Sequence, residues 1–200
     1  ILGIYMLFGT DKNALLELNE SFDLKMKYNF DSLDVDDNSI EDLIEKNYGN
    51  NNVMEKKMEH GTHVAGTIAS GKVGQAPFAK IMCLKTIPTE GDERDKDVGN
   101  AIRYAADNGA DIINMSAGKY FSPRPDFVAD AIRYAEEKGV LFIISAGNEA
   151  EDISIVDSYP KKYMSENGVK KYFSNMIVIS ASSWMQKWSK EKDPGNKNVK

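Results

Sequence analysis

The chain has few of the residues that build cross-links and metal centres. It contains one cysteine, Cys83, so no disulfide can form within it. There are two histidines, His60 and His63, and no cysteine lies near them. A metal bound by this pair would need carboxylates from elsewhere in the chain, so we predict no metal site there and keep metal binding as the alternative.

The sequence also lacks long apolar runs and an excess of positive charge. No run is long enough to span a bilayer. The formal net charge of −6 argues against binding nucleic acid through its phosphates. A length of 200 residues with 42% hydrophobic residues is typical of a globular domain with a substantial core.

The first 52 residues differ in pattern from the rest. The chain begins with Ile rather than Met, which predicts that it starts inside a longer reading frame. The apolar stretch 1–8 has no basic residues before it and no small-residue cleavage pattern, so we expect a core-facing helix or strand rather than a signal-peptide remnant. Apolar residues over 15–24 lie at loosely helical spacing. We predict an acidic loop over 31–37 and a capped short helix over 39–45.

From residue 60 onward, helical patterns alternate with short apolar runs. The predicted helices cover 60–70, 97–108 and 126–138, and the predicted strands cover 79–88, 111–115, 140–145 and 176–180. The strands are continuously apolar, which indicates a parallel sheet with helices on both faces. The predicted fold class is therefore three-layer α/β/α with a mainly parallel sheet, incomplete at both ends of the chain.

An internal repeat supports this fold. The segment Ala101–Ala105 recurs as Ala131–Ala135, and each copy is followed by a glycine, an apolar strand and the tripeptide Ser-Ala-Gly. The two tripeptides are 116–118 and 145–147. Ligands of such folds bind beyond the carboxyl ends of the strands, where both tripeptides are expected.

The segment His60–Gly66 carries the strongest chemical signal. A histidine at the start of a helix is held in place yet accessible, as a general base must be. We expect His63, one turn further on, to face the interior as a structural histidine. We expect Ala65 and Gly66 to let the helix pack closely on the sheet.

This segment resembles the histidine motif of the subtilase family of serine proteases. Further segments match that family in the right order: 74–79 with the strand 80–85, 114–118, 145–148, Tyr159-Pro160 and 177–182. The resemblance covers about residues 53–183. It implies that 53–200 are part of a subtilisin-like peptidase domain and that 1–52 are the end of an insertion.

The resemblance also implies roles for individual residues. His60 would take the proton from a serine hydroxyl, and the amide of Asn148 would stabilise the oxyanion. The backbone of Ser116, Ala117 and Gly118 would bind an extended polypeptide substrate. For Asn148 the alternative is a turn cap. The family further implies a serine endopeptidase that requires no cofactor and lies outside the cytoplasm, as a secreted or extracytoplasmic protein.

Two triad members have no matching motif. There is no Asp-Ser/Thr-Gly and no Gly-Thr-Ser in the chain. Asp31 is followed by Ser32, but Leu33 stands where the family has glycine, so we do not assign Asp31 as catalytic. These 200 residues alone are predicted to be inactive. The alternative is a non-catalytic peptide-binding module; a nucleotide-binding domain is disfavoured because no Gly-rich phosphate loop is present.

Structural calcium is a candidate cofactor. Oxygen-bearing residues match the ligand spacing of a calcium loop at Asp34, Asp36, Asn38, Ile40 (through its backbone), Asp42 and Glu45. Ser39 stands where that loop needs glycine. A solvated acidic loop leading into a helix explains the same residues.

Overall fold

A computed structural model describes residues 3–8, 26–32, 42–46, 48–53, 59–88, 91–149 and 151–181. The helices in this part of the chain are α3 (His60–Ala69), α4 (Asp95–Asp107) and α5 (Pro125–Glu137). The strands there are β1 (Gly3–Phe8), β2 (Lys27–Asn29), β3 (Lys80–Lys85), β4 (Ile112–Met115), β5 (Leu141–Ser145), β6 (Tyr163–Glu166), β7 (Val169–Tyr172) and β8 (Met176–Ile179).

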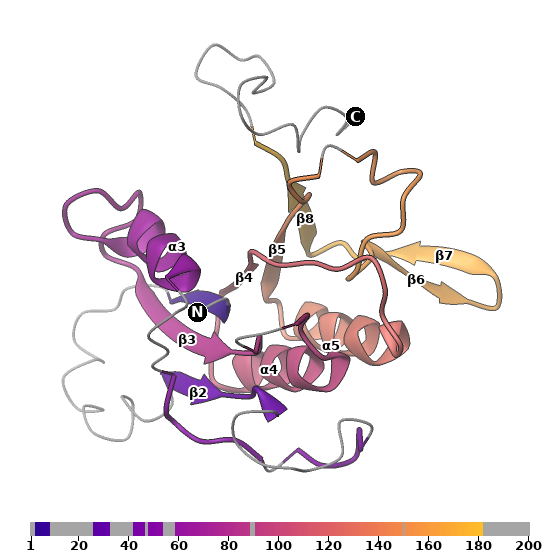
Figure 1. Cartoon of the computed structure of the whole chain (residues 1–200), viewed down its shortest axis with the longest axis horizontal. Coiled ribbons are helices and arrows are strands. Elements are labelled where there is room, and N and C mark those ends of the chain that lie inside the picture. Colours follow the sequence, from indigo (N-terminus) through magenta and orange to yellow (C-terminus); the bar gives the residue numbers. More distant parts are fainter. Residues whose placement is uncertain are drawn as a thin grey trace.

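Six of these strands form one sheet in the order β2-β3-β1-β4-β5-β8 (Figure 1). β2 pairs with β3 in parallel, with Asn29 opposite Lys85, and β4, β5 and β8 are also mutually parallel. β1 runs antiparallel to both of its neighbours, β3 and β4. The sheet is therefore mainly parallel, as the sequence predicts, and the α/β fold class is confirmed.

Helices α4 and α5 pack side by side on one face of this sheet and enclose the core (Figure 1). Ile102 of α4 and Ile132 of α5 are fully buried against Leu84, Ile113 and Phe142 of the strands. Each such side chain contributes about 1.5–3 kcal/mol through its removal from water. The two copies of the internal repeat are these two helices, so the repeated apolar residues are explained by their matching positions in the core.

The opposite face of the sheet is covered unevenly by the described residues. In Figure 1, α3 lies on the other side of β3 from α4, and it meets the sheet mainly at β3. On the far strand, β8, the side chains of Ile177 and Ile179 are 43% and 51% exposed.

The orientation of α3 corrects two predictions, one for His63 and one for Gly66. His63 is exposed rather than facing the interior. A Cβ added to Gly66 would meet no atom within 4 Å, so Gly66 does not mediate close packing on the sheet. Both positions therefore lie on parts of α3 that the described residues of the sheet do not cover.

The predicted helix over 39–45 is wrong for its described part. Residues 42–46 are not helical. Instead, Asp42 Oδ1 accepts hydrogen bonds from the backbone N–H of Ile44 at 2.9 Å and of Glu45 at 3.3 Å. An aspartate that binds its own backbone in this way stabilises a turn and competes with a helix. The remainder of that prediction, and the helical spacing over 15–24, lie outside the described residues.

A hairpin that the sequence analysis did not predict is formed by β6 and β7. The two strands pair antiparallel across Asn167 and Gly168, which have φ of 52° and 78°. Two successive residues with positive φ make the tight turn whose twist matches a hairpin, and Asn-Gly is the favoured pair. This dipeptide was the signal that could have revealed it.

The first 52 residues contribute two strands to the main sheet. The apolar start of the chain forms strand β1, one of the two structures expected for it, and β2 lies at the sheet edge. The boundary between an insertion over 1–52 and a peptidase domain over 53–200 stays a prediction. None of the helices in the described residues is both long and apolar enough to cross a membrane.

Candidate active site

The loops that follow three parallel strands enclose a cleft of about 340 Å³. Because β3, β4 and β5 run in the same direction, their carboxyl ends meet at one edge of the sheet, and the first turn of α3 reaches the same place. The cleft is lined by His60, Ile87, Gly91, Asp92, Glu93, Ser116, Ala117, Gly118, Lys119, Tyr120, Ser145, Ala146, Gly147, Asn148, Glu149, Glu151, Ile153, Val156 and Ser158. All five site residues predicted from the sequence are among them.

His60 is the first residue of α3 and is exposed at the cleft. Partial burial lowers the pKa of its imidazole below the usual 6.5, and the nearby charge of His63 acts in the same direction. A neutral imidazole can accept a proton, which is the chemical requirement for a general base. Within the described residues, no carboxylate is hydrogen-bonded to this ring.

Asn148 lies in the turn that follows β5. Gly147 has φ of 95°, a left-handed conformation that favours glycine. The turn directs the backbone N–H of Asn148 to Glu149 Oε2, at 2.8 Å. The Asn148 side chain is exposed beside the cleft, where its amide is accessible to a ligand.

Residues 116–118 continue from β4 along the cleft. The Asn114 side chain donates to Ser116 Oγ at 3.0 Å and holds the start of this segment. At its end, Lys119 and Tyr159 exchange backbone hydrogen bonds of 3.2 and 2.8 Å. A Cβ on Gly118 would lie 3.4 Å from the carbonyl oxygen of Tyr159, so the chain's own backbone approaches the segment closely from one side.

Asp31 lies away from the cleft lining, after β2. It is 1% exposed, and its Oδ2 accepts a hydrogen bond from Lys85 Nζ at 3.0 Å. Arg94 lies 3.9 Å from its other oxygen. These contacts make Asp31 part of a buried ion pair, and its exclusion from the catalytic residues stays a prediction.

The described residues do not support the predicted calcium pattern. Its candidates Asp34, Asp36 and Asn38 lie outside them. Glu45, the last ligand of the pattern, instead pairs with Lys96 Nζ at 3.4 Å. Across the described part of the chain, no three metal-ligating side chains come together. Calcium stays a prediction.

The sequence analysis missed the charged residues of the cleft. Asp92 and Glu93 come from the loop after β3, and Glu149 and Glu151 from the loop after β5. The signal was available, since these residues follow predicted strands whose carboxyl ends were expected to bind ligand. These four residues lie outside the motifs that resemble the subtilase family.

The comparisons with known proteins agree on one family. The model of the subtilase family matches residues 16–193. Subtilisin BL of Lederbergia lenta is 36% identical over 110 residues, 52% of this chain and 39% of that protein. The major intracellular serine protease of Bacillus subtilis (strain 168) is 38% identical over 112 residues, 52% of this chain and 34% of that protein.

Among solved structures, the epidermin leader peptide processing serine protease of Staphylococcus aureus matches with a TM-score of 0.58 and 22% identity. The match covers 70% of this chain and 37% of that one. At that identity the likeness concerns the fold. The matches span between about a quarter and a half of the length of the curated relatives, from 27% to 47%.

Proposed function

Because the chain belongs to the subtilase family, we propose that it forms part of a serine endopeptidase whose active site includes His60 and Asn148. The observation that carries the proposal is the cleft at the carboxyl ends of β3, β4 and β5. A basic side chain, an amide donor and an extended backbone segment line it together. Those are the parts that acyl transfer to a serine requires.

The mechanism assigns each part a separate task. His60 accepts the proton of a serine hydroxyl as the serine attacks the peptide carbonyl, and then delivers it to the leaving amine. The Asn148 amide donates a hydrogen bond to the oxygen that becomes negative in the tetrahedral intermediate. Residues 116–118 bind the substrate backbone as an added strand, so the partner is a polypeptide in extended form.

The serine and the aspartate of the triad have no matching motif within these 200 residues. The proposal therefore assigns both to sequence outside them. The relatives, of which the chain covers only part, leave room for such sequence. No cofactor is needed for this chemistry.

The test is peptide hydrolysis by the protein expressed from its complete reading frame. His60→Ala should reduce kcat by at least about 10³-fold, because the general base is lost. His63→Ala is the matched control, since His63 is an exposed histidine on the same helix that does not line the cleft. Equal activities of the two variants would contradict the proposal.

A second candidate is a peptide-binding module without catalysis. It rests on the segment 116–118, which lines the cleft and can pair with an extended peptide without any catalytic residue. In that case the complete protein would bind unstructured peptides and release them uncut, and His60→Ala would leave binding unchanged.

Location outside the cytoplasm remains a proposal drawn from the family. One relative is, by its name, intracellular. Immunoblots of culture medium and of cell lysate would distinguish the two locations.

A further inference from the structure

The charges that line the cleft are almost all negative. Asp92, Glu93, Glu149 and Glu151 supply four carboxylates on opposite sides of it. The one lysine among the lining residues, Lys119, has its Nζ 2.9 Å from Asp95 Oδ1 and donates to the backbone oxygen of Glu93 at 2.6 Å. Since Asp95 neutralises Lys119, the negative charges of the cleft are left without an equal positive charge.

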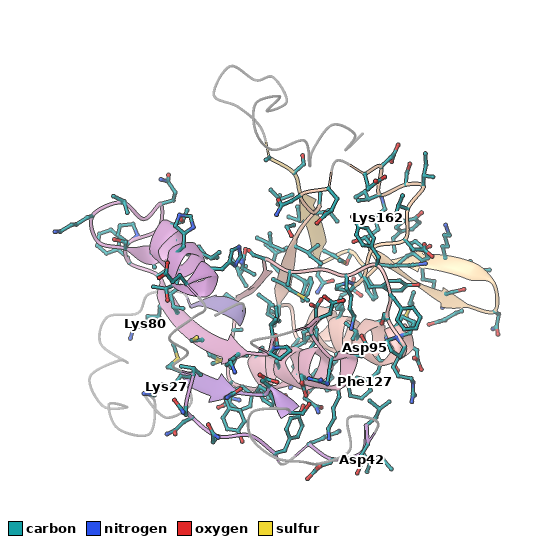
Figure 2. All side chains as sticks on the ribbon, in the orientation of Figure 1. Lys27, Asp42, Lys80, Asp95, Phe127 and Lys162 are labelled. Atoms are coloured by element: carbon teal, nitrogen blue, oxygen red, sulfur yellow. The ribbon has the colours of Figure 1, made fainter. Side chains whose placement is uncertain are left out.

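Asp95, labelled in Figure 2, is fixed in this role at the start of α4. It is 6% exposed and accepts hydrogen bonds from Ser122 Oγ at 2.8 Å and from the backbone N–H of Arg124 at 2.7 Å. These contacts hold its carboxylate against Lys119. The ammonium is therefore not free to turn toward the carboxylates of the cleft.

Glu93 is unusual among the four carboxylates because it is buried. Its side chain is 6% exposed, and its Oε1 is buried without a hydrogen-bond partner. Burial raises the pKa of this carboxyl group, although Lys119 opposes the effect. A buried oxygen with no partner costs about 1–3 kcal/mol, so it is a favourable place for a donor brought by a ligand.

The neighbouring arginine, Arg94, does not donate a hydrogen bond to Glu93 Oε1. Arg94 directs its guanidinium toward Asp31, with 3.9 Å between Nη1 and Oδ1. That contact lies on the buried pair with Lys85 rather than in the cleft. Among the described residues, no group donates a hydrogen bond to Glu93 Oε1.

Tyr120 lies beside the carboxylates of the 149–151 loop. The pKa of its hydroxyl is raised by partial burial and then by the charges of Glu149 and Glu151. Carboxylates therefore line the cleft from the 149–151 loop as well as from the loop that holds Glu93. Both loops line the same cleft as His60 and Asn148.

The arrangement suits a cationic side chain better than a metal ion. No three metal-ligating side chains of the described residues converge on one point, here or elsewhere. A lysine or arginine side chain carries its charge at the end of a long flexible stem and can reach a carboxylate in a recess. An arginine can also donate two parallel hydrogen bonds to one carboxylate.

We propose that the cleft selects polypeptides that carry a lysine or arginine side chain, with the Glu93 carboxylate as its principal contact and Asp92, Glu149 and Glu151 attracting the charge. The inference rests on the proposed function, since it names the substrate class of the same cleft. Glu93 is a specificity-determining residue and takes no part in the bond-breaking step.

The test uses the complete protein and two fluorogenic peptides that differ at a single position, arginine in one and glutamine in the other. The arginine peptide should be cleaved with kcat/KM at least tenfold higher. Glu93→Gln should reduce that ratio about tenfold, through a lower kcat/KM for the arginine peptide. Glu137→Gln is the matched control, because Glu137 is an exposed residue at the end of α5, away from the cleft.

Asp92→Asn provides a second variant, in which the buried Glu93 is unchanged. Asp92 is exposed, so this substitution should fold normally and lower the ratio by a smaller factor. The attraction should also weaken as salt rises from 50 to about 500 mM, since exposed charges are screened. An arginine-to-glutamine ratio near one in the wild type, or one unaltered by Glu93→Gln and by Asp92→Asn, would overturn the inference.

A binding measurement separates this inference from the proposed function. If the protein cleaves neither peptide, the endopeptidase proposal fails. Fluorescence anisotropy of the two labelled peptides then still decides the inference. Tighter binding of the arginine peptide that is lost in Glu93→Gln supports it, and equal affinities reject it.

Discussion

At the scale of single residues, the stability of the fold depends on buried charged side chains that do not line the cleft. Asp31 and Lys85 are each 1% exposed and joined by a 3.0 Å ion pair. Together they link the end of β2 to the end of β3. Such a pair adds little net stability while intact, but removing one partner leaves an isolated buried charge.

We therefore expect Asp31→Ala to lower the free energy of unfolding by about 3–5 kcal/mol. Asp126→Ala is the control, since that aspartate is 71% exposed and its pair with Arg124 should contribute less than about 1 kcal/mol. Urea denaturation followed by circular dichroism measures both. Similar losses for the two variants would mean that burial of the Asp31 pair does not matter.

Asp97 should make the stability of the fold depend on pH. It is fully buried and accepts hydrogen bonds from Tyr48 Oη at 2.8 Å and from the backbone N–H and Oγ of Ser32 at 3.1 and 3.0 Å. Burial raises its pKa from 3.8 to about 6, because desolvation outweighs these hydrogen bonds. Its contribution to stability is therefore complete below pH 4 and is lost as the pH rises through 6.

The Asp97→Asn variant, which cannot ionise, should lack this loss. Between pH 4 and 7 the wild type should lose about 3 kcal/mol more than the variant, the equivalent of a shift of about two pKa units. Denaturation at several pH values measures the difference between the two proteins, in which other titrating groups cancel. Parallel stability curves would show that Asp97 is not the group responsible.

Asn148 gives a catalytic prediction at the same scale. In the complete protein, Asn148→Ala should reduce kcat by about 10²–10³-fold with little change in KM, which is the effect of removing such an amide from a subtilisin. The reason is that the oxyanion forms only in the transition state, so ground-state binding is not affected. Steady-state kinetics measure both parameters. A rise in KM at constant kcat would assign Asn148 to substrate binding instead.

At the scale of elements, two of the helical glycines, Gly66 in α3 and Gly99 in α4, have different surroundings. A methyl group at Gly99 in α4 would overlap the ring of Phe127 in α5, which Figure 2 labels beside these helices. A methyl group at Gly66 in α3 would meet nothing within 4 Å.

Substitution by alanine should therefore have opposite effects at the two positions. Gly99→Ala should destabilise the fold by about 1–3 kcal/mol through overpacking. Gly66→Ala should stabilise it by up to about 1 kcal/mol, because alanine favours the helix and nothing opposes it. Thermal unfolding of the two variants measures the changes, and a destabilising Gly66→Ala would show that α3 is packed more closely than described.

The elements also show how far the sequence could predict the structure. Helices α4 and α5 and strands β3, β4 and β5 follow from apolar patterns that burial in the core fixes, and α3 and β8 follow from their apolar patterns although few of their residues are buried. The turn at Asp42 could not be foreseen from spacing, since a local side-chain hydrogen bond decides it. The antiparallel direction of β1 depends on pairing with two distant strands, about which its own residues carry no signal.

For the site, the segments that resemble the subtilase family were sufficient to select His60, Asn148 and residues 116–118. The structure brings these residues to one cleft. The exposure of His63 could not be predicted, because it depends on where α3 lies over the sheet. The buried position of Glu93 likewise depends on packing between a loop and α4. Roles for these residues stay predictions until they are tested.

At the scale of the whole molecule, the central claim is that this cleft belongs to a serine endopeptidase completed by sequence outside these 200 residues. The most direct measurement is to label the complete protein with a fluorophosphonate and to locate the modified residue by mass spectrometry. We predict a single labelled serine that lies outside residues 1–200, with labelling slowed strongly by His60→Ala and not by His63→Ala. The absence of labelling, or labelling of a serine within residues 1–200, would contradict the account.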